Sequence, residues 1–185
     1  MTRQRRNSLR AVVLGLGLGL FVALQAAPVF AVTCRDVQVW VPNPGQGWRL
    51  VAPGNSGRAG AVSATTTEDA RFSIRLDGPL QTRMVLQLSL VLPGGHRYQT
   101  LTVPVAPEDT TAGRRRLAGF PLPVEEHAVQ LRADDSASEG LGRFVDVPFP
   151  VGGTAIVSSS LYGEWTVEAA VAGESCASTK FRIEE

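Results

Sequence analysis

The feature of this sequence that most constrains its fold is an alternation of apolar and polar residues with a period of two. In residues 83–92, RMVLQLSLVL, every second position from Met84 to Leu92 is apolar, and residues 70–76, ARFSIRL, alternate in the same way. Successive side chains of a β-strand point to opposite faces of a sheet, so the pattern predicts strands with one face in a core. No stretch shows a convincing helical period, and the chain is therefore predicted to be all-β.

Turn-forming residues divide the chain into many short strands. Further alternating segments are CRDVQVWV, YQTLTVPV, HAVQLRA, GRFVDVPFPV, EWTVEAAV and CASTKFRI, and GTAIVSSSLY is a candidate for another. Residues 41–69 are predicted to be loop except for one short strand around WRLV, and Pro148 and Pro150 predict an edge or a bulge. Seven to nine antiparallel strands in about 150 residues predict a β-sandwich, with a jelly roll or a small barrel as the alternative.

The first 31 residues have the order of a secretory signal. A basic start, MTRQRRNSLR, is followed by an apolar run and by small residues before a predicted cleavage site after Ala31. The apolar run is short for a membrane span, so no span is expected after cleavage. RRNSLR resembles a twin-arginine signal except that Ser8 replaces the usual Phe, and a general secretory signal is the alternative. Either signal predicts a bacterial periplasmic or secreted protein, with residues 32–185 as one domain.

The predicted mature chain is mildly acidic. Four of the 18 basic residues leave with the signal, so 14 remain against 17 acidic residues, a formal charge of −3. Nucleic-acid-binding domains carry a basic footprint, so no nucleic-acid partner is expected.

The two cysteines, Cys34 and Cys176, lie near the two ends of the predicted mature chain. An even pair in an oxidising compartment predicts a disulfide, and free thiols or a lipid-modified Cys34 are the alternatives. The alternation places Cys34 on the face of Asp36, and Cys176 on the face of Ser178. Both thiols are therefore predicted to point away from the core, where a bond would tie two neighbouring strands and hold the ends of the chain together.

The last 25 residues or so resemble the closing strands of immunoglobulin-like and fibronectin type III-like bacterial domains. Those families often end with a Gly-x-aromatic-x-Val strand, a tight hairpin and a final strand with Phe-x-Val or Phe-x-Ile. GEWTVEAAV and KFRI are similar to that ending. The resemblance implies an immunoglobulin-like sandwich in which Trp165 takes the place usual for Tyr. Val167 stands where antibody domains have a cysteine, so the antibody disulfide is not implied.

Several residues are candidates for chemistry or binding. His127 with Glu125, and separately His96, are candidate metal ligands, although adjacent strand residues point to opposite faces. The alternative is that they are solvated polar residues at strand ends.

Two tryptophans and one arginine cluster are candidates for a binding surface. Trp40 has outward parity and Trp48 follows a Gly/Pro loop, and the alternative is that both indoles cover an edge of the sandwich. Arg114, Arg115 and Arg116 form a basic run predicted in a loop, where they are either solvated or an anion contact.

The sequence predicts a non-enzymatic binding or accessory domain of the bacterial envelope. No Gly-x-Ser-x-Gly elbow or other nucleophile–base arrangement is present, and no cofactor is expected. The expected partner is another envelope protein or a polysaccharide. A periplasmic metal-binding or hydrolytic enzyme is one alternative, and a structural subunit of a surface assembly is another.

Overall fold

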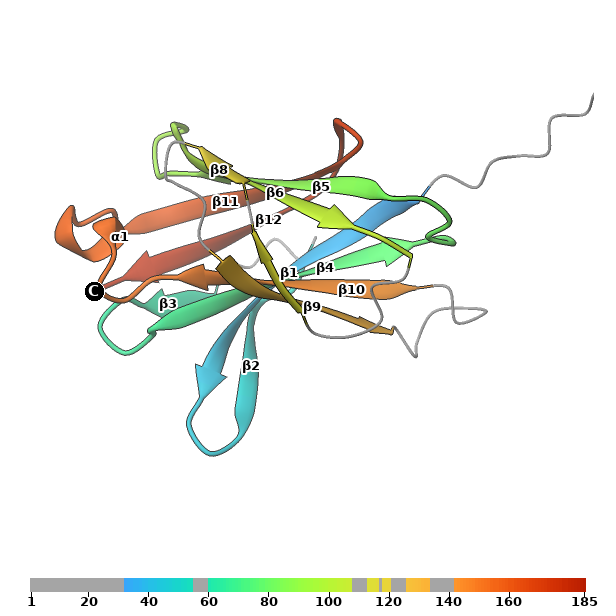
Figure 1. Cartoon of the computed structure of the whole chain (residues 1–185). Helices are drawn as coiled ribbons and strands as arrows, with labels where there is room; N and C mark the ends of the chain where they lie inside the picture. Colours follow the sequence, from blue (N-terminus) through green and yellow to red (C-terminus); the bar gives the residue numbers. More distant parts are fainter. Residues whose placement is uncertain (1–31, 55–59, 108–112, 117, 121–125, 134–141) are drawn as a thin grey trace, which may run out of the picture.

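The chain folds into two β-sheets packed face to face (Figure 1). The computed structural model describes residues 32–54, 60–107, 113–116, 118–120, 126–133 and 142–185. In this part of the chain, sheet one has the order β2 (Gly47–Ala52), β1 (Thr33–Asn43), β4 (Asp69–Asp77), β10 (Arg143–Pro150), β9 (Glu126–Ala133) and β7 (Gly113–Arg116). Sheet two has the order β3 (Ala61–Ser63), β12 (Glu174–Glu184), β11 (Gly163–Val171), β5 (Met84–Val91), β6 (Arg97–Val105) and β8 (Ala118–Phe120). The ladders are antiparallel apart from β3 beside β12. The predicted signal, residues 1–31, lies outside the described residues.

The predicted all-β sandwich is confirmed, and within the described residues the two sheets are not joined into a closed barrel. Sheet one contains the order β1-β4-β10-β9, and sheet two contains β12-β11-β5-β6-β8. β3, β7 and β8 have three or four residues each, too few to leave an alternation pattern in the sequence.

The core lies between the sheets and is built from the alternating positions. Val37 and Val39 of β1 are fully buried, and so are the central inward residues of β4, β5 and β10: Phe72, Ile74, Leu86, Leu88, Leu90, Val145 and Val147. Four aromatic residues from β4, β10, β11 and β12 form its centre, with ring centroids 5.0–6.3 Å apart: Phe72, Phe149, Trp165 and Phe181. Tilted and edge-to-face contacts of this kind stabilise a core beyond the area they bury. Because two of these strands belong to each sheet, the cluster joins the sheets.

Trp165 also satisfies its polar group inside the core. Its indole N–H donates a hydrogen bond of 2.9 Å to the carbonyl oxygen of Leu161, four residues upstream. Tyr98 packs edge-on against Trp165 at 5.1 Å, and burial raises the pKa of its phenol.

Three predictions about local structure are wrong. Residues 155–158 of GTAIVSSSLY form a one-turn helix, α1 (Ala155–Ser158), because the Thr154 side chain accepts from the Ile156 N–H as an N-cap. The arginine run lies on β7 rather than in a loop, and residues 41–69 contain β3 as well as β2. β3 and β7 depend on pairing with strands that are distant in the sequence, which local patterns do not encode.

The two prolines of β10 occupy the positions that the sequence predicts. β10 pairs with β4 along its whole length, but its ladder with β9 ends at Asp146. Pro148 and Pro150 therefore lie where β10 has a ladder with β4 but none with β9, as expected for prolines at the edge of a sheet.

The β11–β12 hairpin contains a strained alanine that provides a stability test. Val171 pairs with Glu174, and the two residues between them, Ala172 and Gly173, have φ of 51° and 88°, as in a type I′ turn. Alanine is disfavoured in this region, whereas Asn tolerates it. Ala172→Asn should therefore raise the free energy of unfolding by about 0.5–1 kcal/mol, measured by urea denaturation. Ala170→Asn, on the neighbouring strand, should be neutral or destabilising; equal effects at both positions would contradict the explanation.

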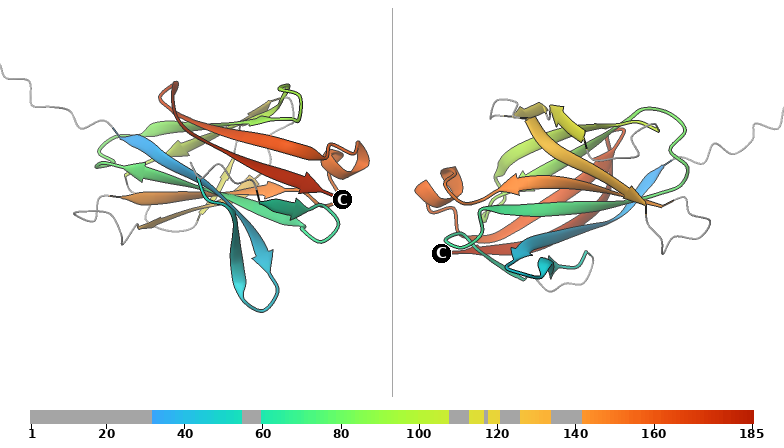
Figure 2. Two further views of the ribbon diagram at one scale, coloured as in Figure 1. Left: turned by 180° about the vertical axis from the view of Figure 1, so that it is seen from behind. Right: turned by 60° about the horizontal axis from the view of Figure 1, so that its bottom comes forward.

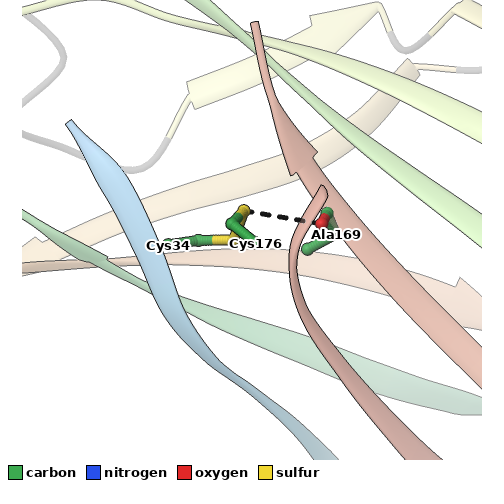
Figure 3. The surroundings of a disulfide bond; sticks show 3 residues. All are labelled: Cys34, Ala169 and Cys176. Atoms are coloured by element: carbon green, nitrogen blue, oxygen red, sulfur yellow. Dashed lines mark hydrogen bonds between the residues drawn. A yellow bond between two sulfur atoms is a disulfide. The ribbon is translucent and has the colours of Figure 1, made fainter. Parts of the chain in front are cut away.

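Cys34 and Cys176 form a disulfide with a Cα–Cα distance of 5.3 Å and a sequence separation of 142 residues (Figure 3). The bond joins β1 of sheet one to β12 of sheet two, so the prediction that it would tie two neighbouring strands is wrong. The prediction of an outward thiol is also wrong for Cys34, which is 4% exposed and belongs to the core.

Two β-bulges explain this difference. Cys34 pairs with Leu76 and Asp36 with Arg75, so Arg35 is an extra residue that reverses the parity of β1. Cys176 is itself the extra residue of β12, opposite the step between Ala169 and Ala170. Its Sγ lies 3.4 Å from the Ala169 carbonyl oxygen (dashed in Figure 3), a contact only, because a disulfide sulfur has no hydrogen to donate. The bulges therefore turn both sulfurs into the space between the sheets.

Candidate functional site

The outer face of sheet one contains a row of side chains that crosses four strands. Trp40 of β1 lies opposite Leu50 of β2 on one side and Arg71 of β4 on the other, and Arg71 lies opposite Pro148 of β10. Directly opposed residues of a ladder point to the same face, so all four lie on the face away from the core. The next pair along the hairpin, Pro42 and Trp48, continues this surface.

Arg71 lies against both tryptophans. Its Cζ is 4.3 Å from the ring centroid of Trp48 and 5.7 Å from that of Trp40. The sum of these two distances sets an upper limit of about 10 Å on the separation of the two ring centroids. Each cation–π contact is worth about 0.5–2 kcal/mol, depending on how far it is removed from water. Trp40, Trp48, Arg71, Pro42 and Leu50 are called the tryptophan–arginine face below.

A buried carboxylate on the neighbouring strand β10 forms an ion pair with Arg71. Asp146 of β10 is 1% exposed, and its Oδ2 lies 3.7 Å from an Nη of Arg71. The hydroxyl of Ser73, which is fully buried, donates a hydrogen bond to the other carboxylate oxygen. A buried charge is tolerated when it is paired and hydrogen-bonded, and the Arg71 guanidinium supplies the pairing. Asp146 and Ser73 thus restrict the position of the arginine that contacts both indoles.

Trp40 is held by a second set of hydrogen bonds along β1. Its indole N–H donates to the side-chain oxygen of Gln38 at 3.2 Å, and the Gln38 amide donates to Asp36 at 3.0 Å. These three residues alternate along the outer face of the strand. The Trp40 ring is half-buried and has a fixed orientation.

Trp48 is the exposed part of this face. It is 41% exposed and Leu50 is 36% exposed, and with Val85 on sheet two they are the large apolar residues that the described part of the chain leaves most open. The β1–β2 hairpin projects from the body of the sandwich (Figures 1 and 2). Arg71 covers one face of the Trp48 ring, so the open area belongs to the other face and the edge. Neighbouring side chains thus hold Trp40 and Arg71, and Trp48 forms the open aromatic surface beside them.

The other predicted binding residues lie away from this face. Arg114, Arg115 and Arg116 are on β7, at the edge of sheet one opposite β2. Four inter-strand steps separate β7 from β1, which amounts to about 19 Å. The basic run and the two tryptophans therefore do not form one surface.

The two histidines that were predicted as separate candidate metal ligands lie on different sheets. His96 is exposed in the turn between β5 and β6 of sheet two, whereas His127 lies near the start of β9 in sheet one, and Glu125 lies outside the described residues. Among the residues that the structure describes, no three His, Cys, Asp or Glu side chains are grouped as metal ligands.

Sequence reasoning missed Arg71, Ser73 and Asp146 as members of the site. Arg71 and Ser73 are predicted to point outward, but the sequence gives no sign that β1 and β10 flank β4. Asp146 carried the clearest available signal, since it is an acid within the otherwise apolar run FVDVPF, residues 144–149.

No described helix has the length and apolar character needed to cross a membrane. Comparisons with protein-family models, with curated proteins and with solved structures find no match for this chain. The tryptophan–arginine face is therefore the feature on which an argument about function rests.

Proposed function

We propose that the protein is an exported, non-enzymatic binding module of the bacterial envelope, with an immunoglobulin-like sandwich as scaffold and the tryptophan–arginine face as its binding surface. The observation that carries this proposal is the Trp48 ring, which is 41% exposed yet stacked on an arginine that a buried carboxylate holds. An aromatic side chain that served packing alone would gain by being buried. Tryptophan and arginine are also the residues that most often dominate binding energies.

Export of the protein is supported by the disulfide and by the character of residues 1–31. A disulfide is compatible with an oxidising compartment outside the cytoplasm, where such bonds persist. The N-terminus has a basic segment, then an apolar run, then small residues, and this order supports the same location outside the cytoplasm.

The proposal predicts that the face retains a component of the envelope. Immobilised protein should capture material from an envelope extract of the producing bacterium, and Trp48→Ala should reduce the captured amount at least tenfold, because a central aromatic anchor is lost. Retained material is measured by mass spectrometry and by total sugar analysis of the eluate.

Val85→Ala is the matched control, because Val85 has the same 41% exposure and lies on the other sheet. It should behave as the wild type, and both variants should unfold at nearly the wild-type denaturant concentration. If the three proteins capture the same material, or none captures anything, the proposed function is wrong.

A further inference from the structure

We infer that the ligand of the tryptophan–arginine face is a neutral polysaccharide chain, an inference that rests on the proposed function. In the part of the chain that the structure describes, the tryptophan–arginine face combines an exposed aromatic side chain with an arginine that a buried carboxylate pairs.

The size of the open apolar surface favours a narrow ligand. A tryptophan residue has about 250 Å² of surface, so 41% exposure leaves roughly 100 Å² of Trp48 open. Leu50 and Pro42 extend this area along the hairpin, but the total stays well below the roughly 800 Å² that each partner contributes to a standard protein interface. A chain of sugar rings needs only a strip of this width.

The charge of the hairpin favours a neutral ligand. Arg49 is the one charged residue between Trp40 and Gly54 in the sequence, and its ladder position opposite Val41 places it on the other face of β2 from Trp48. The positive charge of Arg71 is offset by Asp146. An acidic polymer or a charged headgroup would therefore meet little opposite charge near Trp48 to offset its own. The uncharged hydroxyl groups of a neutral sugar need no such counter-charge.

The chemistry of the face matches one side of a sugar ring. A pyranose has a side of C–H groups, whose partial positive charge suits the negative face of an aromatic ring. Trp40, at most about 10 Å from Trp48, extends the aromatic surface beneath a longer chain.

The test uses sedimentation of the intact, disulfide-bonded protein with three preparations of the producing bacterium's envelope. One preparation is untreated, one is digested with protease, and one is treated with periodate, which cleaves the vicinal diols of sugars. We expect binding to the untreated and protease-digested envelopes, and at least a tenfold loss after periodate. Binding should persist in about 0.5 M NaCl, where contacts between exposed charges are screened.

Variants connect the binding to the ring. Trp48→Ala should lose binding to the protease-digested envelope at least tenfold, Trp48→Phe should keep part of it, and Val85→Ala should keep all of it. Binding that disappears after protease and survives periodate would identify a protein partner; it would overturn this inference and leave the proposed function standing. Binding lost in high salt would overturn the neutral ligand. Absence of binding to the untreated envelope would remove the proposed function itself.

Discussion

Replacing both cysteines, Cys34→Ala with Cys176→Ala, should lower the free energy of unfolding by about 5 kcal/mol. The bond closes a loop of 142 residues, and in the chain-entropy model a cross-link of that length removes about this much freedom from the unfolded chain. The value is an upper one, because the unfolded chain retains some structure. Guanidinium denaturation of the oxidised wild type and of the double variant measures the difference.

Reduction of the wild type provides the control for this prediction. Reduced wild type keeps both cysteine side chains and loses only the cross-link, so its stability should lie close to that of the double alanine variant. The variant should be slightly less stable, because Cys34 is 4% exposed and its replacement by alanine leaves a void. Reductant should not affect the double variant. If oxidised and reduced wild type unfold at the same denaturant concentration, the bond contributes no stability and the explanation fails.

Trp165→Ala should lower the free energy of unfolding by about 3–5 kcal/mol, the range for removing a large aromatic residue from a core. Trp165 is fully buried, contacts three other aromatic rings and joins β11 to strands of both sheets. Its loss leaves a cavity at the centre of the sandwich. Urea denaturation followed by far-ultraviolet circular dichroism measures the change.

A second variant separates packing from hydrogen bonding at this position. Trp165→Phe keeps an aromatic ring but leaves the carbonyl oxygen of Leu161 without the indole N–H, so it should cost about 1–3 kcal/mol. Trp48→Ala, which removes an exposed indole, should change stability far less. Equal losses for Trp165→Ala and Trp48→Ala would show that the core assignment is wrong.

The strands that carry the core were predictable because their signal is local. Val37, Val39 and Val41, or Phe72 and Ile74, identify an inward face by alternation alone, since burial on one side of a strand imposes a period of two. The elements that escaped prediction are short or depend on distant partners. β3 exists because it lies beside β12, and α1 because Thr154 caps a single turn.

The candidate site was half predictable. Trp40 has the expected outward parity, and Trp48 follows the expected Gly/Pro turn. What brings the two rings together is Arg71, which approaches them only because β4 pairs with β1, and Asp146, which approaches Arg71 only because β10 pairs with β4. Contacts across a ladder depend on register and strand order, and neither is a property of a single segment.

The sequence by itself determined that the chain is all-β, which residues of the longer strands point inward, and that Cys34 and Cys176 are the pair available for a disulfide. The tertiary structure decided where that disulfide lies and which outward residues meet. Single-residue bulges at Arg35 and Cys176 reverse the parity on which the sequence argument depended, and they direct the bond between the sheets. Alternation is a local consequence of burial, whereas a bulge is detected only in the ladder between two strands that are distant in the sequence.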